Sequence, residues 1–192
     1  MSVVEIPLTQ GKVALIDAED AERVQTYKWH ACRREPNWYA GTSAERRRGN
    51  NMIYLHRLVA NAKRGEHVDH INGNGLDCRR ENLRICTNAE NRRNTRSRRG
   101  SSPFKGVSIN RKNGQRVWHA AISVNDKTIS LGSYYTEAEA ARAYNAAAFQ
   151  YYGEFACLNE IEGLTHEESI VPPVRNRKPG RPFRDATVCT SA

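Results

Sequence analysis

Apolar and polar residues alternate in short stretches along the first half of the chain, and Gly, Pro, Asn or Asp bounds each stretch, as is typical of strands. The predicted strands are residues 13–16, 27–32, 38–42 and 52–58. Residues 68–70 and 82–86 then flank two Asn-Gly pairs, which favour turns. Thr87 and Glu90 have the spacing of a helix-capping box. Residues 68–95 are therefore predicted to form a strand, a loop, a strand and a short helix.

The second half repeats the alternation at residues 104–109, 117–124 and 127–131, with turn signals at residues 113–114 and 125–126. Thr136 and Glu139 predict a second capping box, and Gly153 ends the helix that follows. The apolar positions of this helix recur on one face: Ala140, Ala143, Tyr144, Ala147, Ala148 and Tyr151. We expect a three-stranded antiparallel sheet backed by one alanine-rich helix, and α+β as the fold class. From residue 160 onward Gly, Pro and charged residues predict a loose tail.

Alternation also assigns the two faces of this sheet. The face toward the helix is expected to carry Val107, Ile109, Trp118, Ala120, Ile122, Ile129 and Leu131. The exposed face is expected to carry Ser108, Asn110, His119, Ala121, Ser123, Thr128 and Ser130.

Composition narrows the function classes. The 192 residues carry 30 Lys and Arg against 21 Asp and Glu, a formal net charge of +9 that suits a polyanionic partner. The longest apolar run is too short for a membrane span, and residues 1–10 lack the layout of a signal peptide. The five cysteines form no CxxC pair, so reduced thiols in a cytosol are expected rather than a disulfide scaffold or a zinc ribbon.

Basic charge is concentrated in two segments that lack acids, residues 92–99 and 175–184. Such a run is either a solvated linker or an arm laid along phosphates. The second run includes Gly180-Arg181-Pro182, a short sequence found in minor-groove-binding peptides.

One group of residues has the chemistry for phosphodiester cleavage. Asp69 and His70 adjoin the turn, and Asn82 and Asn91 follow on the returning segment and the short helix. Carboxylate and amide oxygens suit a hard divalent ion, and an imidazole can deprotonate water. Neighbouring strand residues point to opposite faces, so a kink at the strand end is needed to bring Asp69 and His70 together.

Residues 54–94, with the pattern VDHINGN…NLR…N, resemble the HNH nuclease family in its phage and intron homing-endonuclease branch, whose fold is the ββα-metal hairpin. The resemblance implies that His70 is the general base, Asp69 a metal ligand, and Asn82 the residue that braces the hairpin loop. Asn91 takes the position of the last metal ligand, where many members have His. With asparagine at this position, the chain resembles the branch of the family that binds one metal ion and nicks one DNA strand. Whether it cleaves one strand or both stays open.

Residues 103–159, including FKGVSIN and ISLGSYYTEAEAARAYNAAAFQYYGEFACLN, resemble the DNA-binding domain of plant ethylene-response (Apetala-two type) factors. That family docks its sheet in the DNA major groove. The expected DNA contacts, taken from the basic run, the sheet face and its rims, are Arg92, Arg93, Arg96, Arg98, Arg99, Lys105, Ser108, Asn110, Arg111, Arg116, His119, Ser123, Lys127, Thr128 and Ser130.

Together these features predict a site-selective DNA endonuclease that uses one Mg²⁺ or Mn²⁺ and a histidine base. The expected segments are a nuclease module at 1–95, a basic linker at 96–102, a DNA-binding domain at 103–159 and a basic tail at 160–192. The expected partner is double-stranded DNA, bound by a monomer in the cytoplasm of a bacterial host, with a phage or intron as the gene's setting. Two alternatives stay open: a non-enzymatic DNA-binding regulator on a degenerate nuclease scaffold, and an RNA-binding or packaging accessory. His56 is expected to give structural support.

Overall fold

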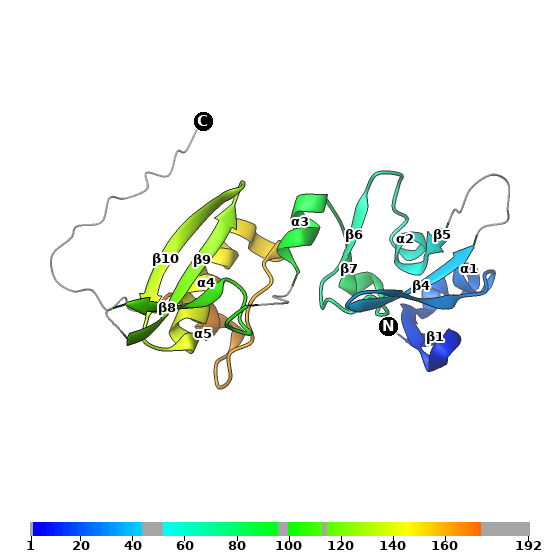
Figure 1. The fold of residues 1–192 in the computed structure, drawn as a ribbon. Coiled ribbons are helices and arrows are strands. Elements are labelled where there is room, and N and C mark those ends of the chain that lie inside the picture. The colour runs from blue at the N-terminus through cyan, green and yellow to red at the C-terminus, as the bar shows by residue number, and fades with distance from the viewer. Residues whose placement is uncertain (1, 44–51, 96–99, 113–114, 174–192) are drawn as a thin grey trace, which may run out of the picture. The chain divides into compact units, whose positions relative to one another are not determined.

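The computed structural model describes residues 2–43, 52–95, 100–112 and 115–173, and for residues 111–115 it describes no side chains. The chain divides into two compact units. The first comprises Met1–Arg98 and Ala148–Asn159, and the second comprises Arg99–Ala147 and Glu160–Ala192. Both contain strands and helices, so the predicted α+β class is confirmed (Figure 1). Among the described residues, no helix is long and apolar enough to cross a lipid bilayer.

Among its described residues, the first unit contains three small antiparallel sheets, β1–β2, β3–β4–β5 and β6–β7. Its strands are β1 (Val3–Pro7), β2 (Val13–Asp17), β3 (His30–Arg34), β4 (Asn37–Ser43), β5 (Met52–Tyr54), β6 (His67–His70) and β7 (Leu83–Cys86). Its helices are α1 (Ala21–Gln25), α2 (Leu55–Val59) and α3 (Asn88–Arg93). The buried core of this unit comprises Ile6, Ala14, Ile16, Val24, Trp29, Ala40, Leu55, Val59 and Cys78.

Two of the predicted strands need correction. Residues 52–58 form the short strand β5 followed by the helix α2, because Leu55 and Val59 have the i, i+4 spacing that buries one helical face in the core. Residues 27–29 precede β3 as irregular chain, and the Trp29 indole donates to the Val24 carbonyl at 2.8 Å. That bond fixes Trp29 at the end of α1 instead of in a sheet.

The predicted strand–loop–strand–helix arrangement of residues 68–95 is present as β6, a loop, β7 and α3. In the antiparallel pair Asp69 lies opposite Arg84, and His70 lies opposite Leu83. The capping box forms as predicted, with the Thr87 side chain accepting from the Glu90 backbone and the Glu90 side chain accepting from the Thr87 backbone. This local cap fixes where α3 begins, directly after β7.

The second unit is built on the sheet β10–β9–β8, with strands β8 (Val107–Lys112), β9 (Gln115–Val124) and β10 (Lys127–Tyr134). Asn125 and Asp126 join β9 to β10 with φ of 48° and 61°, which is the positive-φ hairpin turn that their residue types favour. Helix α4 (Glu137–Tyr152) follows the predicted cap between Thr136 and Glu139. The core of this unit comprises Val107, Ala120, Tyr134, Ala140, Ala141, Ala143 and Ile161.

The second half departs from the sequence-based expectations in some details. Residues 160–173 are not a loose tail, because Ile161 is buried in the core and α5 (His166–Ile170) begins with a complete capping box at Thr165. Ile109 lies opposite Trp118, which packs against the core, so its expected face is supported, but its side chain is 36% exposed and not part of the core. Tyr151, expected on the buried face of α4, is also exposed.

Candidate functional site

Asp69 and His70 close strand β6, and both side chains are buried, with exposures of 5% and 6%. Their neighbours differ: the Asp69 carboxylate contacts polar groups of β7 and the chain after α3, whereas the His70 ring contacts aromatic rings. This difference follows from the alternation of side chains along a strand. The hairpin therefore presents a carboxylate and an imidazole in two distinct environments.

The Asp69 carboxylate is fully engaged by hydrogen-bond donors. Arg84 donates to Oδ2 from Nε at 2.9 Å and from Nη2 at 2.6 Å. The Asn94 amide nitrogen donates to both carboxylate oxygens at 3.1 Å and to the His70 carbonyl at 2.9 Å. The sequence-based prediction missed both partners. The role of Arg84 depends on the strand register, and that of Asn94, three residues after Asn91, depends on how the chain packs after α3.

The electrostatic setting of His70 favours a neutral imidazole. Burial lowers the pKa of His70 to about 4, although the nearby Asp69 and Asp77 carboxylates act to raise it. The ring is therefore unprotonated at neutral pH and able to accept a proton. Its Nε2 is buried and has no hydrogen-bond partner in the described part of the chain.

Aromatic side chains from β4 and α2 contact the His70 ring. The His56 ring lies 4.9 Å away between centroids in an edge-to-face arrangement, and the Tyr39 ring lies 5.8 Å away at 59°. Tyr54 stacks on His56 at 5.5 Å. Burial is also the main reason that the pKa of His56 falls, to about 3. Gly75 lies directly against the Tyr39 ring, where a Cβ would overlap it.

The Asn82 side chain forms hydrogen bonds within the loop between β6 and β7. Its side-chain oxygen accepts from the Asn72 backbone at 2.9 Å, and its amide nitrogen donates to the Asp77 carbonyl at 2.8 Å. The Asn72 amide in turn donates to the Asp77 carboxylate at 2.8 Å. These contacts, one buried and two partly buried, connect Asn72, Asp77 and Asn82 within the loop that follows His70.

The residue types at this site fit a hard divalent ion. Asp69 supplies a carboxylate, and Asn91, half-buried on α3, carries an amide oxygen, although the asparagine that contacts Asp69 here is Asn94. Mg²⁺ commonly takes one or two such ligands and completes its shell with water and substrate phosphate. Within the described ranges, no cluster of three His, Cys, Asp or Glu side chains could hold an ion. The Arg84 guanidinium forms an ion pair with the Asp69 carboxylate, so a metal ion would have to compete with Arg84 for this carboxylate.

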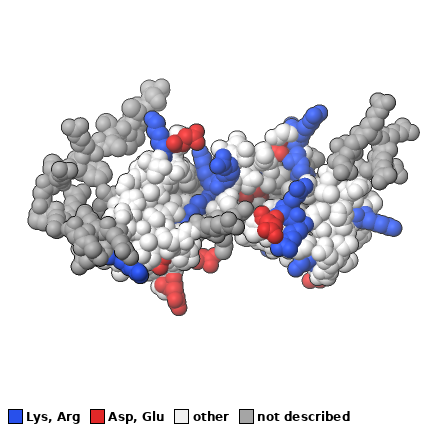
Figure 2. Space-filling model, in the orientation of Figure 1, with Lys and Arg blue, Asp and Glu red and all other residues white. Residues whose placement is uncertain are grey.

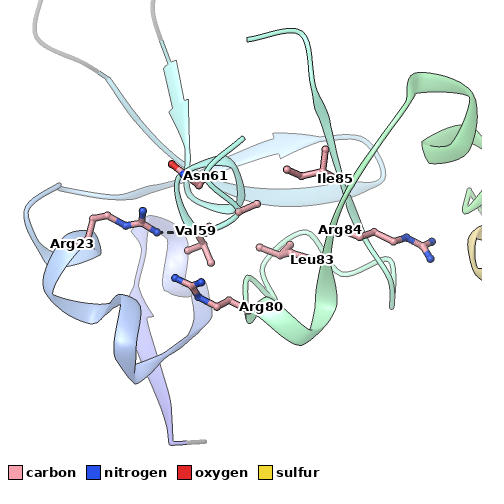
Figure 3. Close-up of a pocket in the computed structure, with 8 residues that line it drawn as sticks. Arg23, Val59, Asn61, Arg80, Leu83, Arg84 and Ile85 are labelled. Atoms are coloured by element: carbon pink, nitrogen blue, oxygen red, sulfur yellow. Dashed lines mark hydrogen bonds between the residues drawn. The ribbon is translucent and has the colours of Figure 1, made fainter. Parts of the chain in front are cut away.

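A separate pocket of about 330 Å³ lies beside the hairpin and does not include Asp69 or His70 (Figure 3). The side chain of Arg23 donates to the Val59 carbonyl at its rim, at 3.4 Å. The guanidinium groups of Arg23 and Arg80 are both paired with the buried Asp20. In Figure 3 the Arg84 side chain points away from the other residues that line the pocket. Arg84 therefore lines the pocket and also pairs with Asp69, but the pocket and the Asp69 site are separate.

The residues expected to contact DNA are only partly described. On α3, Arg92 is exposed and the Arg93 guanidinium lies 5.0 Å from the centroid of the Tyr152 ring. Arg96, Arg98 and Arg99 lie outside the described residues, as does the side chain of Arg111. Figure 2 shows basic side chains spread over the visible face of both units rather than gathered in one patch.

The expected DNA-contact face of the second sheet is polar and mostly exposed. Its exposed members are Ser108, Asn110, Arg116, Ser123, Lys127, Thr128 and Ser130, with Lys105 half-buried beside them. His119 lies partly exposed, and its Nε2 is 3.0 Å from the Ser130 hydroxyl. Ser123 and Thr128 approach within 3.4 Å across the same two strands. The face thus offers hydroxyl and imidazole groups that can both donate and accept.

Comparisons with known proteins agree with the hairpin geometry. The chain is 28% identical over 153 residues to an uncharacterized HNH endonuclease of Acanthamoeba polyphaga mimivirus, covering 80% of this chain and 78% of the viral protein. It is 38% identical over 87 residues to APETALA2-like protein 2 of Oryza sativa, covering 44% of this chain and 19% of the rice protein. No solved structure matches significantly.

A further partial similarity, 33% over 89 residues, is to an AP2-like ethylene-responsive transcription factor of Arabidopsis thaliana, covering 36% of this chain and 29% of the plant protein. The family model for the HNH endonuclease matches residues 53–93, which span β5, α2, the β6–β7 hairpin and α3. Residues 53–93 are therefore similar to the HNH endonuclease family, and the rest of the chain lies outside this match.

Proposed function

We propose that the chain is a site-selective DNA endonuclease in which the β6–β7–α3 hairpin hydrolyses the phosphodiester bond. The observation that carries this proposal is the neutral, buried imidazole of His70 next to the Asp69 carboxylate on one HNH hairpin. A neutral imidazole accepts the proton of the attacking water, and the resulting hydroxide is the nucleophile. Asn82 keeps the loop after His70 fixed while this proton moves.

Asp69 and Asn91 are the residues that would hold Mg²⁺ or Mn²⁺. The chemistry that such an ion supplies when bound is stabilisation of negative charge on the phosphate and on the leaving oxygen. The products implied by the resemblance to homing endonucleases carry a 5′-phosphate and a 3′-hydroxyl. Nicking of one strand is the form of cleavage that the asparagine at position 91 favours.

Site selection is assigned to the exposed face of the sheet β10–β9–β8. The partial similarity to plant transcription-factor sequences supports this assignment, as does the polar character of the face around His119 and Ser130. Small hydroxyl groups give weaker base discrimination than bidentate arginines do, so we expect modest sequence selectivity. Lys105, Arg116 and Lys127 would position the sheet on backbone phosphates.

Incubation of the purified full chain with supercoiled and with linear DNA tests the proposal. Open-circular product is expected with Mg²⁺ and is expected to disappear with excess EDTA or with Asp69→Ala. The alternative, a DNA-binding regulator without catalysis, predicts binding to the same DNA and intact substrate under every condition. Full cleavage in EDTA would instead refute the metal-dependent mechanism.

A further inference from the structure

The segment that follows α4 packs against the β6–β7 hairpin. Residues 148–159 come after the second sheet in the sequence, but they belong to the first compact unit. Gly153, with φ of 54°, ends α4 and begins the short 3-10 helix η4 (Gly153–Phe155). Glycine adopts a positive φ without steric cost, so the chain can turn sharply at this residue. The turn brings η4 against α3 and against the side chain of Arg84.

The guanidinium group of Arg84 is held by three different partners. Its Nε and Nη2 donate to Oδ2 of Asp69 at 2.9 and 2.6 Å. Its remaining nitrogen, Nη1, donates to the backbone carbonyl of Glu154 at 2.5 Å. The group lies over the ring of Phe155, with 4.1 Å between Cζ and the ring centroid. An anion, a carbonyl oxygen and an aromatic ring therefore enclose this side chain, which is only 12% exposed.

These three contacts reinforce one another because the guanidinium is a rigid, planar group. The negative face of an aromatic ring attracts a cation, and the attraction is stronger where water is excluded. The contacts with Phe155 and the Glu154 carbonyl therefore stabilise the position in which Arg84 pairs with Asp69. Displacing the guanidinium from the carboxylate would weaken these contacts as well.

We propose that Phe155, together with the Glu154 carbonyl, sets the affinity of Asp69 for a divalent cation by holding Arg84 on that carboxylate. Phe155 is a positioning residue, because it acts on Asp69 through Arg84. The inference rests on the proposed function, in which Asp69 holds the metal ion. The segment after α4 thereby regulates metal binding at the same site.

Mn²⁺ binding to the full chain, measured by electron paramagnetic resonance without DNA, tests the proposal. Phe155→Leu removes the ring and is expected to raise the Mn²⁺ affinity about threefold or more, the scale of one cation–π contact shielded from water. Phe155→Tyr keeps the aromatic face and is expected to retain the wild-type affinity. An unchanged affinity in Phe155→Leu overturns the proposal.

The same segment offers a matched control. The Arg93 guanidinium lies 5.0 Å from the centroid of the Tyr152 ring, but of these two arginines Arg84 is the one paired with Asp69. Tyr152→Leu also removes a ring from this segment, and it is expected to leave the Mn²⁺ affinity unchanged. An increase as large as that in Phe155→Leu would show that general loosening of the segment is the cause, which overturns the role of Phe155.

A fluorinated ring separates the charge distribution of Phe155 from its packing. Pentafluorophenylalanine, incorporated at this position alone, nearly keeps the shape of phenylalanine but lacks the negative ring face. It is expected to raise the Mn²⁺ affinity as Phe155→Leu does. Circular dichroism checks the fold of each variant, and if Phe155→Leu is misfolded, the fluorinated protein decides. A wild-type affinity in the fluorinated protein overturns the proposal.

A double-mutant cycle tests whether Phe155 acts through Arg84. In an Arg84→Gln background, Phe155→Leu is expected to leave the Mn²⁺ affinity unchanged, and an increase that persists there overturns the proposal. Affinities in the expected order, combined with intact supercoiled DNA, would support the inference and contradict the proposed function. Wild-type Mn²⁺ affinity in Asp69→Ala would overturn both the metal assignment and the inference.

Discussion

Arg84 forms an ion pair with Asp69 across the β6–β7 hairpin, with two guanidinium nitrogens on one carboxylate oxygen and side-chain exposures of only 12% and 6%. The same arginine lies 4.1 Å from the centroid of the Phe155 ring. The carboxylate expected to bind a divalent ion is therefore already neutralised by a fixed cation. A metal ion and Arg84 compete for the same negative charge.

Replacing Arg84 by Gln should accordingly raise the affinity for Mn²⁺. Removing one close positive charge is worth more than about 1.4 kcal/mol at a partly buried site, which corresponds to a gain of about tenfold or more. Electron paramagnetic resonance counts free Mn²⁺ and measures this affinity without DNA. Arg64→Gln, at an exposed position of the same unit, is the control. Equal affinities in the two variants would show that Arg84 does not compete for the site.

The same Arg84→Gln substitution should reduce stability in the absence of metal. It leaves the Asp69 carboxylate buried without its cationic partner, a change that typically costs about 3–5 kcal/mol. Urea unfolding measures the loss, and added Mn²⁺ should restore part of it, because a ligand that binds only the folded state stabilises that state. A variant as stable as the wild type would mean that Asp69 is solvated in solution.

Asp77 should make the loop sensitive to acid. Hydrogen bonds from the Arg79 side chain hold the pKa of Asp77 below its ordinary value of 3.8, against the effect of burial. The stability that it contributes is therefore complete above about pH 4 and is lost as the pH falls through the folded-state pKa.

Asp77→Asn is expected to cost about 2 kcal/mol at pH 7, the scale of a charged hydrogen bond, and progressively less below pH 4. Urea unfolding of both proteins at pH 7, 4 and 3 measures the difference. A difference that stays constant down to pH 3 would contradict the role assigned to the charge.

Two substitutions on the second sheet should affect DNA binding in different ways, one through its salt dependence and the other through its sequence preference. Lys127→Gln should weaken binding to all sequences alike and flatten the plot of log affinity against log salt by about 0.9, the contribution of one phosphate contact. His119→Ala should leave that slope unchanged and reduce the preference for the selected site, because base edges carry the sequence information. Binding titrations at several salt concentrations measure both. If His119→Ala leaves the preference intact, this face does not read the site.

Several features that depend on local chemistry could be predicted from the sequence, although the equally local capping box at Thr165 was not. The capping boxes at Thr87 and Thr136 and the turn at Asn125 form as predicted, because each involves residues within one turn of chain. Helix α2 was mistaken for a strand because five residues are too few to reveal a period, and burial of Leu55 and Val59 decides the outcome.

The contacts of the candidate site depended on information that a sequence does not carry. Asp69, His70, Asn82 and Asn91 could be named from their pattern, but the partners of Asp69 required the strand register and the packing of the chain after α3. His56 lies fourteen positions before His70, and only the fold brings their rings together. Roles for these residues, the identity of the metal and the host setting stay predictions.

The most direct test of the account is the single-turnover rate at which the full chain with Mg²⁺ converts supercoiled DNA, compared between the wild type and His70→Ala. Loss of a general base should slow cleavage by about a hundredfold or more. DNA affinity, measured on the same samples, should remain unchanged, because His70 is buried and makes no part of the proposed DNA-contact face. A wild-type cleavage rate in His70→Ala would contradict the claim that this histidine is the base.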